Sequence, residues 1–150
     1  MDILGRLILR LLLVPLGVVV ASVVAAALIL VAEHNAWRAI LDADPDAWID
    51  YVMALLGGGP GAVPLVPFVL YSLVPALAGV LMAEGFAIRS WIFHAGNGGI
   101  ATAIGWTVTQ GIGDRYVFVE PRIAVAAGLA AGFAYWIIAG RTAGLRNARP

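Results

Sequence analysis

The sequence predicts an all-α integral membrane protein, with four transmembrane helices and an interfacial amphipathic helix between the first and second spans. Two observations predict it. Of the 150 residues, 62% are hydrophobic and 12% are charged, against roughly 45–50% and about 25% in soluble domains. Four apolar stretches also run without an Asp, Glu, Lys or Arg, and a soluble domain of this size cannot bury so much apolar surface.

The predicted spans are residues 11–32, 62–83, 91–109 and 123–140, within a single domain over residues 1–150. A helix needs about 20 mostly apolar residues to cross a hydrocarbon layer of about 30 Å, and each stretch is close to that length. The first span also has features of a secretory signal peptide. Its apolar run exceeds the usual core of roughly 7–15 residues, so a retained span is the favoured interpretation. The mass of the mature protein decides between the two.

The arginines outside the spans predict the orientation. If all four spans cross, six arginines lie on one side and three on the other. The positive-inside rule then places both termini in the cytoplasm, with the bacterial inner membrane as the expected location. The six are Arg6, Arg10, Arg89, Arg141, Arg146 and Arg149, and the three are Arg38, Arg115 and Arg122.

The longest connection, residues 33–61, contains the predicted interfacial helix over residues 45–56. Asp44 before Pro45 is a typical N-cap followed by proline at the first helical position. Trp48 and the apolar residues after it follow helical spacing, so the helix is expected to lie in the plane of the membrane interface. The favoured interpretation is a connector that rests on lipid. The alternative is a lid or a docking surface for a periplasmic partner.

The uncharged spans narrow the functions that this chain can perform. Ionisable side chains within a membrane are costly and usually functional, and the predicted spans contain no Asp, Glu, Lys or Arg. This excludes the buried carboxylate relay of a proton-coupled transporter and the arginine ladder of a voltage sensor. The remaining candidate is a polar intramembrane site formed by His94 and Asn97 in the third span and by Tyr71 and Ser72 in the second.

Two hypotheses account for His94 and Asn97, which lie three residues apart on one helix face. In the first, His94 transfers a proton or binds a ligand, and residues 97–99 unwind as in the broken helices of transporters. In the second, which is favoured, His94 lies near the interface and Asn97 forms a hydrogen bond between helices.

No cofactor is predicted. The chain has no cysteine and therefore no thiolate metal site. Its two histidines, His34 and His94, are expected near opposite ends of the bundle, too far apart to hold one haem iron between them. A haem shared with a second subunit through His94 stays open. The formal net charge is zero, which provides no basic field for nucleic acid, so the expected partner is the lipid bilayer.

The fourth span carries a face of small residues. Ala124, Gly128 and Gly132 recur every four residues, and small residues let membrane helices approach closely. This face is expected to meet either another span of the same chain or a partner.

Glu84 stands at the inner end of the second span, where the helix dipole disfavours a carboxylate. A nearby cation would offset this, so Glu84 is expected to form an ion pair at the cytoplasmic surface with Arg89 or Arg141.

Two segments give the chain a resemblance to a group of known proteins. Residues 83–90 are AEGFAIRS and residues 135–144 are YWIIAGRTAG. These motifs are similar to segments of small four-span inner-membrane proteins of alphaproteobacteria, over roughly the second half of the chain. The resemblance implies a bacterial inner-membrane location and supplies no catalytic residue.

The favoured function is that of a non-enzymatic accessory or assembly subunit, which acts through helix–helix association in a homo-oligomer or a larger membrane complex. The alternative is a small transporter or channel component with a polar path along the third span. An enzyme is least favoured, because the sequence contains no recognisable nucleophile–base pair, metal cluster or carboxylate pair.

Overall fold

The computed structural model of the chain describes residues 3–32, 34, 38, 42, 48, 49, 65–112 and 120–144. These residues form four α-helices, which confirms the predicted all-helical class. The helices are α1 (Ile3–Ala32), α4 (Leu65–Phe86), α5 (Trp91–Ile112) and α6 (Pro121–Ile138), and a single 3-10 turn, η2 (Gly140–Thr142), follows α6. The interfacial helix predicted over residues 45–56 falls almost entirely outside the described residues.

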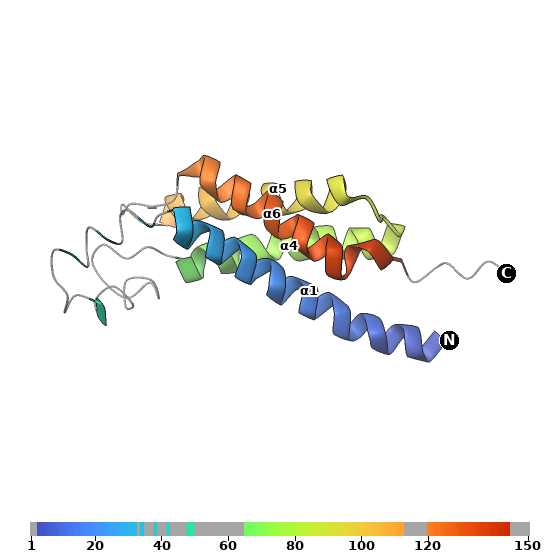
Figure 1. Cartoon of the computed structure of the whole chain (residues 1–150). Coiled ribbons are helices and arrows are strands. Elements are labelled where there is room, and N and C mark those ends of the chain that lie inside the picture. Colours follow the sequence, from blue (N-terminus) through green and yellow to red (C-terminus); the bar gives the residue numbers. More distant parts are fainter. Residues whose placement is uncertain are drawn as a thin grey trace.

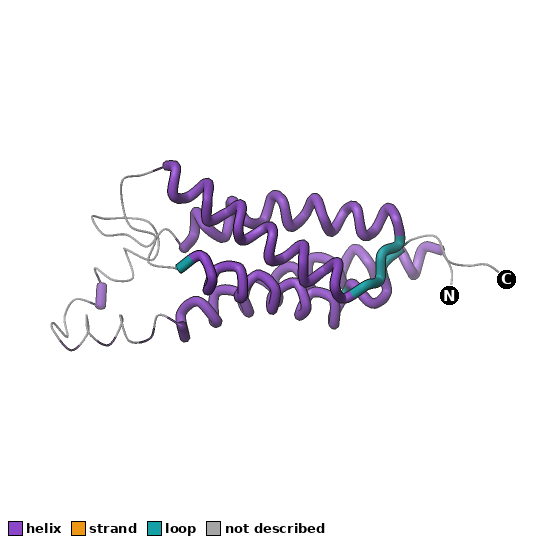
Figure 2. The backbone as a smooth tube through the Cα atoms, turned by 90° about the horizontal axis from the view of Figure 1, so that it is seen from above, coloured by secondary structure: helices purple, strands orange, loops and turns teal. Residues whose placement is uncertain are grey.

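The four helices lie side by side along one axis (Figures 1 and 2). Going around the bundle, α4 packs on α5, α5 on α6 and α6 on α1, whereas the backbones of α1 and α4 lie farther apart. The start of α1 and the end of α6 lie at the same end of the bundle, close to the short loop between α4 and α5. Three sides of the bundle are therefore formed by close helix packing, and on the fourth, side chains of α1 and α4 share buried apolar clusters.

Three of the helices contain segments long and apolar enough to cross a membrane, namely Leu9–Ala32, Pro67–Phe86 and Pro121–Ile138. They correspond to the first, second and fourth predicted spans, with ends that differ by a few residues. The outward side chains are apolar along their length, as lipid-facing residues are, and include Leu11, Val31 and Val74. The chain thus has the helices of a membrane protein. The predicted third span is a helix of sufficient length, α5, but its composition is less apolar than that of the other three.

The loop between α4 and α5 is only four residues long, because α4 ends in a tight backbone cap. Ile88 N–H donates to the Ala83 carbonyl at 2.9 Å, and Ala87 between them has a φ of 54°. This is the hydrogen bond of a Schellman cap, with alanine at the left-handed position that glycine usually occupies. The cap turns the chain sharply, so that α5 runs back along α4.

The packing of α5 against α6 depends on glycine. A Cβ atom at Gly128 would overlap Thr102 and the Gly98 carbonyl, and a Cβ at Gly132 would overlap the His94 carbonyl. Backbone therefore lies directly against backbone along this seam. The small-residue face predicted in the fourth span meets α5 of the same chain through its two glycines. Its third member, Ala124, is buried in an apolar cluster with Ile29, Phe68 and Ala127.

Candidate functional site

A cavity of about 90 Å³ lies at the centre of the bundle and is lined by residues of all four helices. Small side chains on α1 and α4 make room for it, among them Ala21, Ala25 and Ala76. Most of the lining is carbon. The polar side chains in the lining are Ser22, Ser72, His94, Asn97, Thr102 and Tyr135.

Apolar side chains of α1 and α4 flank the cavity along its length. Phe68 of α4 and Ile29 of α1 belong to one buried apolar cluster. Val80 of α4 belongs to a second cluster, against which Val18 and Ala21 of α1 pack. The outward side chains of both helices are apolar.

His94 is the most enclosed polar side chain of the site, with 2% of its surface exposed. It lies in the first turn of α5, between the rings of Phe93 and Tyr135, whose centroids are 5.5 and 5.4 Å away. Its Nε2 lies 3.2 Å from the carbonyl oxygen of Ile88, while its Nδ1 is buried and has no hydrogen-bond partner. A buried nitrogen without a partner is costly, so this atom marks a place where a further group is expected.

Three other polar side chains of the site, Asn97, Ser72 and Thr102, donate to backbone carbonyls. Asn97 Nδ2 donates to the Ala76 carbonyl of α4 at 3.0 Å. Ser72 donates to the Phe68 carbonyl at 2.8 Å, and Thr102 donates to carbonyls one turn back in α5. The bond from Asn97 crosses between two helices, which is the role that the favoured sequence hypothesis gave to this residue.

Of the four side chains predicted to form the polar intramembrane site, three line the cavity, namely Ser72, His94 and Asn97. The fourth does not. Tyr71 is 40% exposed and faces outward from α4, because it is one position along the helix from Ser72 and adjacent helical residues point about 100° apart. Sequence reasoning also missed Tyr135, which is buried, lines the cavity and lies with its ring tilted against that of His94.

A second polar cluster lies at the end of the bundle where α4 turns into α5. The structure does not contain the predicted pair of Glu84 with Arg89. Glu84 instead forms an ion pair with Arg10 of α1 and accepts a hydrogen bond from the Gly144 N–H. Arg89 follows the cap of α4 and is directed elsewhere, with its Nε donating to the Ala143 carbonyl at 3.0 Å.

Trp136 completes this cluster by donating from its indole N–H to the Arg89 carbonyl at 2.8 Å. Arg141, the other predicted partner of Glu84, donates to Ile137 one turn back and lies over the Trp136 ring. The cluster therefore joins α1, α4, the loop after α4 and the segment after α6. We refer to Arg10, Glu84, Arg89, Trp136 and Gly144 as the Glu84 end of the bundle.

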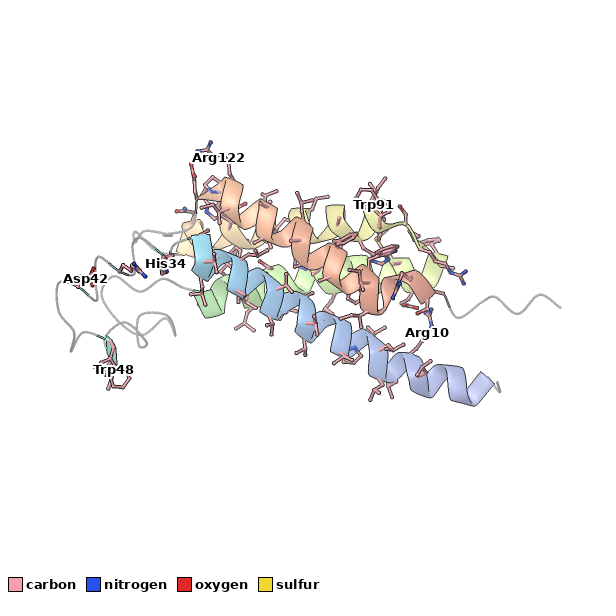
Figure 3. All side chains as sticks on the ribbon, viewed as in Figure 1. Arg10, His34, Asp42, Trp48, Trp91 and Arg122 are labelled. Atoms are coloured by element: carbon pink, nitrogen blue, oxygen red, sulfur yellow. The ribbon has the colours of Figure 1, made fainter. Side chains whose placement is uncertain are left out.

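The two histidines are far apart, as the sequence predicted. Figure 3 places His34 at one end of the bundle and Trp91, three residues before His94, toward the other. Within the described ranges, no three His, Asp or Glu side chains are close enough together to hold a metal ion. The polar groups that line the cavity are hydroxyl, amide and imidazole groups.

Comparison with known proteins did not identify a relative of this chain. No protein-family model matches the sequence, and no curated protein or solved structure is significantly similar to it.

Proposed function

We propose that the chain is a non-enzymatic integral protein of the bacterial inner membrane with four spans, of which α5 is one, and with both ends in the cytoplasm. The low hydropathy of α5 arises from Gly, Thr, His and Asn and not from charge. Thr102 and Thr109 donate to carbonyls of their own helix, and Asn97 donates to α4. These groups need no water, which is the condition for a helix to lie within hydrocarbon.

The position of α5 also supports a crossing. It packs between α4 and α6, both of which are apolar enough to span a membrane. It is joined to α4 by four residues and runs back beside it along its length (Figure 2). If α4 crosses the bilayer, α5 crosses with it.

We further propose that the protein holds a lipid-soluble molecule in the central cavity. The observation that carries this proposal is the cavity itself, which lies between all four helices and has a few polar side chains on a mostly carbon wall. Mostly apolar cavities with a few convergent polar groups are the usual form of a ligand site. This agrees with the sequence alternative of a polar site along the third span, but with binding as the activity.

Binding is favoured over catalysis because the hydroxyl groups of the cavity are not placed to act as nucleophiles. Ser72 and Thr102 each donate to backbone carbonyls, and a nucleophilic hydroxyl instead needs an adjacent general base. Neither hydroxyl forms a hydrogen bond with His94, the imidazole of the cavity that could serve as a base.

The test is photolabelling in liposomes with a small lipid-soluble diazirine. Ala101 of α5 lines the cavity and is 2% exposed, so lipid around the protein does not reach it. We expect label on Ala101 or its neighbours. Ala21→Leu, which fills the cavity from α1, should reduce that label, whereas Ala27→Leu on the exposed face of α1 should not.

Label confined to outward residues such as Val74, with none on the buried face of α5, would show that the cavity holds no such molecule. Equal α5 labelling in the Ala21→Leu and Ala27→Leu proteins would also overturn the proposal. Since both substitutions are Ala to Leu on one helix, any general effect on α1 applies to both.

The accessory-subunit hypothesis remains a second proposal, and one observation favours it. α1 packs mainly on α6 and presents large side chains outward, including Leu12, Val19 and Val23. The glycines of α6 are used inside the chain, so α1 is the helix left to meet a partner. Cysteine at Val19 should form a disulfide-linked dimer in membranes if that partner is a second copy, and Val74→Cys on α4 serves as the control.

A further inference from the structure

We propose that the outer face of α5 and α6, at the Glu84 end, binds an anionic phospholipid, whose phosphate contacts Arg89 and Arg141 and whose acyl chains lie on a row of aromatic rings. We refer to Arg89, Trp91, Phe133, Trp136 and Arg141 as the Trp136 patch. The inference goes beyond the proposed function and does not involve the cavity. It takes from that function only that α4 and α5 cross the bilayer, so that the loop between them lies at a membrane surface.

The two arginines carry positive charge that the described part of the protein does not neutralise. The carboxylate of Glu84, the nearest acid to Arg89 along the chain, is occupied by Arg10 and the Gly144 N–H. Within the described ranges, neither Arg89 nor Arg141 forms an ion pair with a carboxylate, and both residues are exposed. The Trp136 patch is therefore positively charged and accessible to an anion.

Each of these arginines is fastened to the backbone through its Nε atom. Arg89 Nε donates to the Ala143 carbonyl at 3.0 Å, and Arg141 Nε donates to the Ile137 carbonyl at 2.8 Å. An arginine has five N–H donors, and in the part of the chain that the structure describes the terminal nitrogens of both side chains have no acceptor. These nitrogens suit a phosphate, which guanidinium groups bind with parallel hydrogen bonds. Because both side chains are already held in place, binding costs less conformational entropy.

Trp136 brings the two arginines into one patch. Its indole N–H donates to the Arg89 carbonyl at 2.8 Å, and the Arg141 guanidinium lies over its ring, 5.9 Å from the centroid. The Arg89 side chain in turn contacts Ala143, two positions after Arg141. Both arginines are thus anchored on the same short segment, residues 136–143, and we assign them to one headgroup.

A row of aromatic rings leads away from the arginines along the outer face of α5 and α6. Trp136 stacks on Phe133 with the ring centroids 5.5 Å apart, and Phe133 lies at right angles to Trp91 of α5 at 6.2 Å. Trp91 is 51% exposed and Phe133 is 42% exposed. Tryptophan favours the membrane interface, and the row offers an apolar surface to acyl chains. Cations beside such a surface match both parts of a phospholipid, whereas a soluble anion would use the arginines alone.

The charge of the patch favours an anionic over a zwitterionic phospholipid. Phosphatidylcholine presents its phosphate together with a quaternary ammonium, which the arginines repel. Phosphatidylglycerol has the same phosphate and no cation. An arginine near anionic lipid contributes roughly fivefold in affinity, so two arginines predict a preference of roughly 20-fold.

The test is native mass spectrometry of the full chain in detergent micelles, titrated with phosphatidylglycerol or with phosphatidylcholine of the same acyl chains. We expect the wild-type protein to bind phosphatidylglycerol roughly 20-fold more tightly. Arg89→Gln and Arg141→Gln should each reduce this preference roughly fivefold, and the double variant should abolish it. Arg141→Lys keeps the charge and should keep most of the preference.

Arg122→Gln is the matched control, because it also removes one arginine, but from an exposed pair with Glu120 at the opposite end of the bundle (Figure 3). It should leave the preference unchanged. Inorganic phosphate, compared with sodium chloride at the same ionic strength, should not displace phosphatidylglycerol, because it makes no contact with the aromatic row. Micelles have no leaflets, so the result does not depend on the number of crossings or on the orientation of the chain.

Equal affinity of the wild-type protein for the two lipids would overturn the proposal, and this comparison does not depend on any variant folding. A preference that survives in the double variant, or that falls equally in Arg122→Gln, would show that the two arginines are not the site. Displacement by inorganic phosphate would identify a site for a free anion and not for a lipid. Each of these results would leave the proposed crossings and the proposed cavity ligand unaffected, because separate measurements test them.

Discussion

The ion pair between Arg10 and Glu84 joins α1 to α4, whose backbones lie farther apart than those of the other neighbouring helices. Both side chains are largely enclosed, at 14% and 17% exposure, and the Arg10 guanidinium has no hydrogen-bond acceptor in the described part of the chain apart from Glu84. Removal of either partner leaves the other charge enclosed and unpaired, which is usually far more costly than loss of an exposed pair. This pair therefore holds α1 to α4 at the Glu84 end of the bundle.

We expect Arg10→Met and Glu84→Gln each to lower the free energy of unfolding by about 2 kcal/mol, between the values for buried and exposed pairs. The double variant should lose clearly less than the two single losses added together. The measurement is reversible unfolding by SDS in mixed micelles. Arg122→Gln is the control, because its pair with Glu120 is exposed at the opposite end (Figure 3) and should contribute far less to the free energy of unfolding. Additive losses at Arg10 and Glu84 would contradict the coupling.

Some residues of the site could be found from the sequence, and others could not. His94, Asn97 and Ser72 could be found because polar groups are rare in apolar spans and stand out there. The partner of Glu84 could not, because chain proximity favours Arg89, whereas the actual partner is 74 positions away, at 84 − 10, on a helix that reaches it only through packing. Tyr135 was missed for the same reason, since nothing along the chain indicates that it lies beside His94.

At the scale of the helices, the glycines of α5 are not equivalent. A Cβ at Gly98 would overlap the Gly128 carbonyl, whereas a Cβ at Gly96 would meet nothing within 4 Å. In a membrane, helix association depends on such close approach, so the two positions should respond differently to the same substitution.

We expect Gly98→Ala to lower the free energy of unfolding by about 2 kcal/mol or more, because α5 and α6 must separate to admit the methyl group. Gly96→Ala should be neutral or slightly stabilising, since alanine is the better helix former. Both variants are compared with the wild type by unfolding in SDS. Equal losses at the two sites would show that helix propensity, and not the seam, decides stability.

The positions of the helices were largely predictable, because long apolar stretches without charged residues are a strong signal. The residues at which each helix begins and ends were less predictable. α1 begins at Ile3, eight positions before the predicted start at residue 11, because arginine is a good helix former and does not end a helix where the apolar run ends. The arrangement of the helices was not predictable, since hydropathy does not specify neighbours. That α5 lies between α4 and α6 follows from glycine contacts that involve both chain segments at once.

At the scale of the whole molecule, the bundle combines two kinds of helix packing. The α5–α6 seam brings backbones into contact through glycine, whereas α1 and α4 are joined through side chains, in two apolar clusters and one ion pair. The cavity is lined from both sides, by α1 and α4 and by α5 and α6. The close seam therefore provides a rigid wall, and the larger helix separation leaves room for the cavity.

The number of crossings can be tested directly, because the chain has no cysteine and any introduced thiol is unique. Ser90 precedes α5 and Glu120 follows it, and both are exposed. We expect Ser90→Cys to react with a membrane-impermeant maleimide only after the inner membrane is opened, and Glu120→Cys to react while it is intact. The wild-type protein should remain unlabelled. If both thiols react from the same face, α5 does not cross and the four-span proposal is wrong. If they react from opposite faces but with Ser90 outside, the crossing stands and the arginine-based orientation fails.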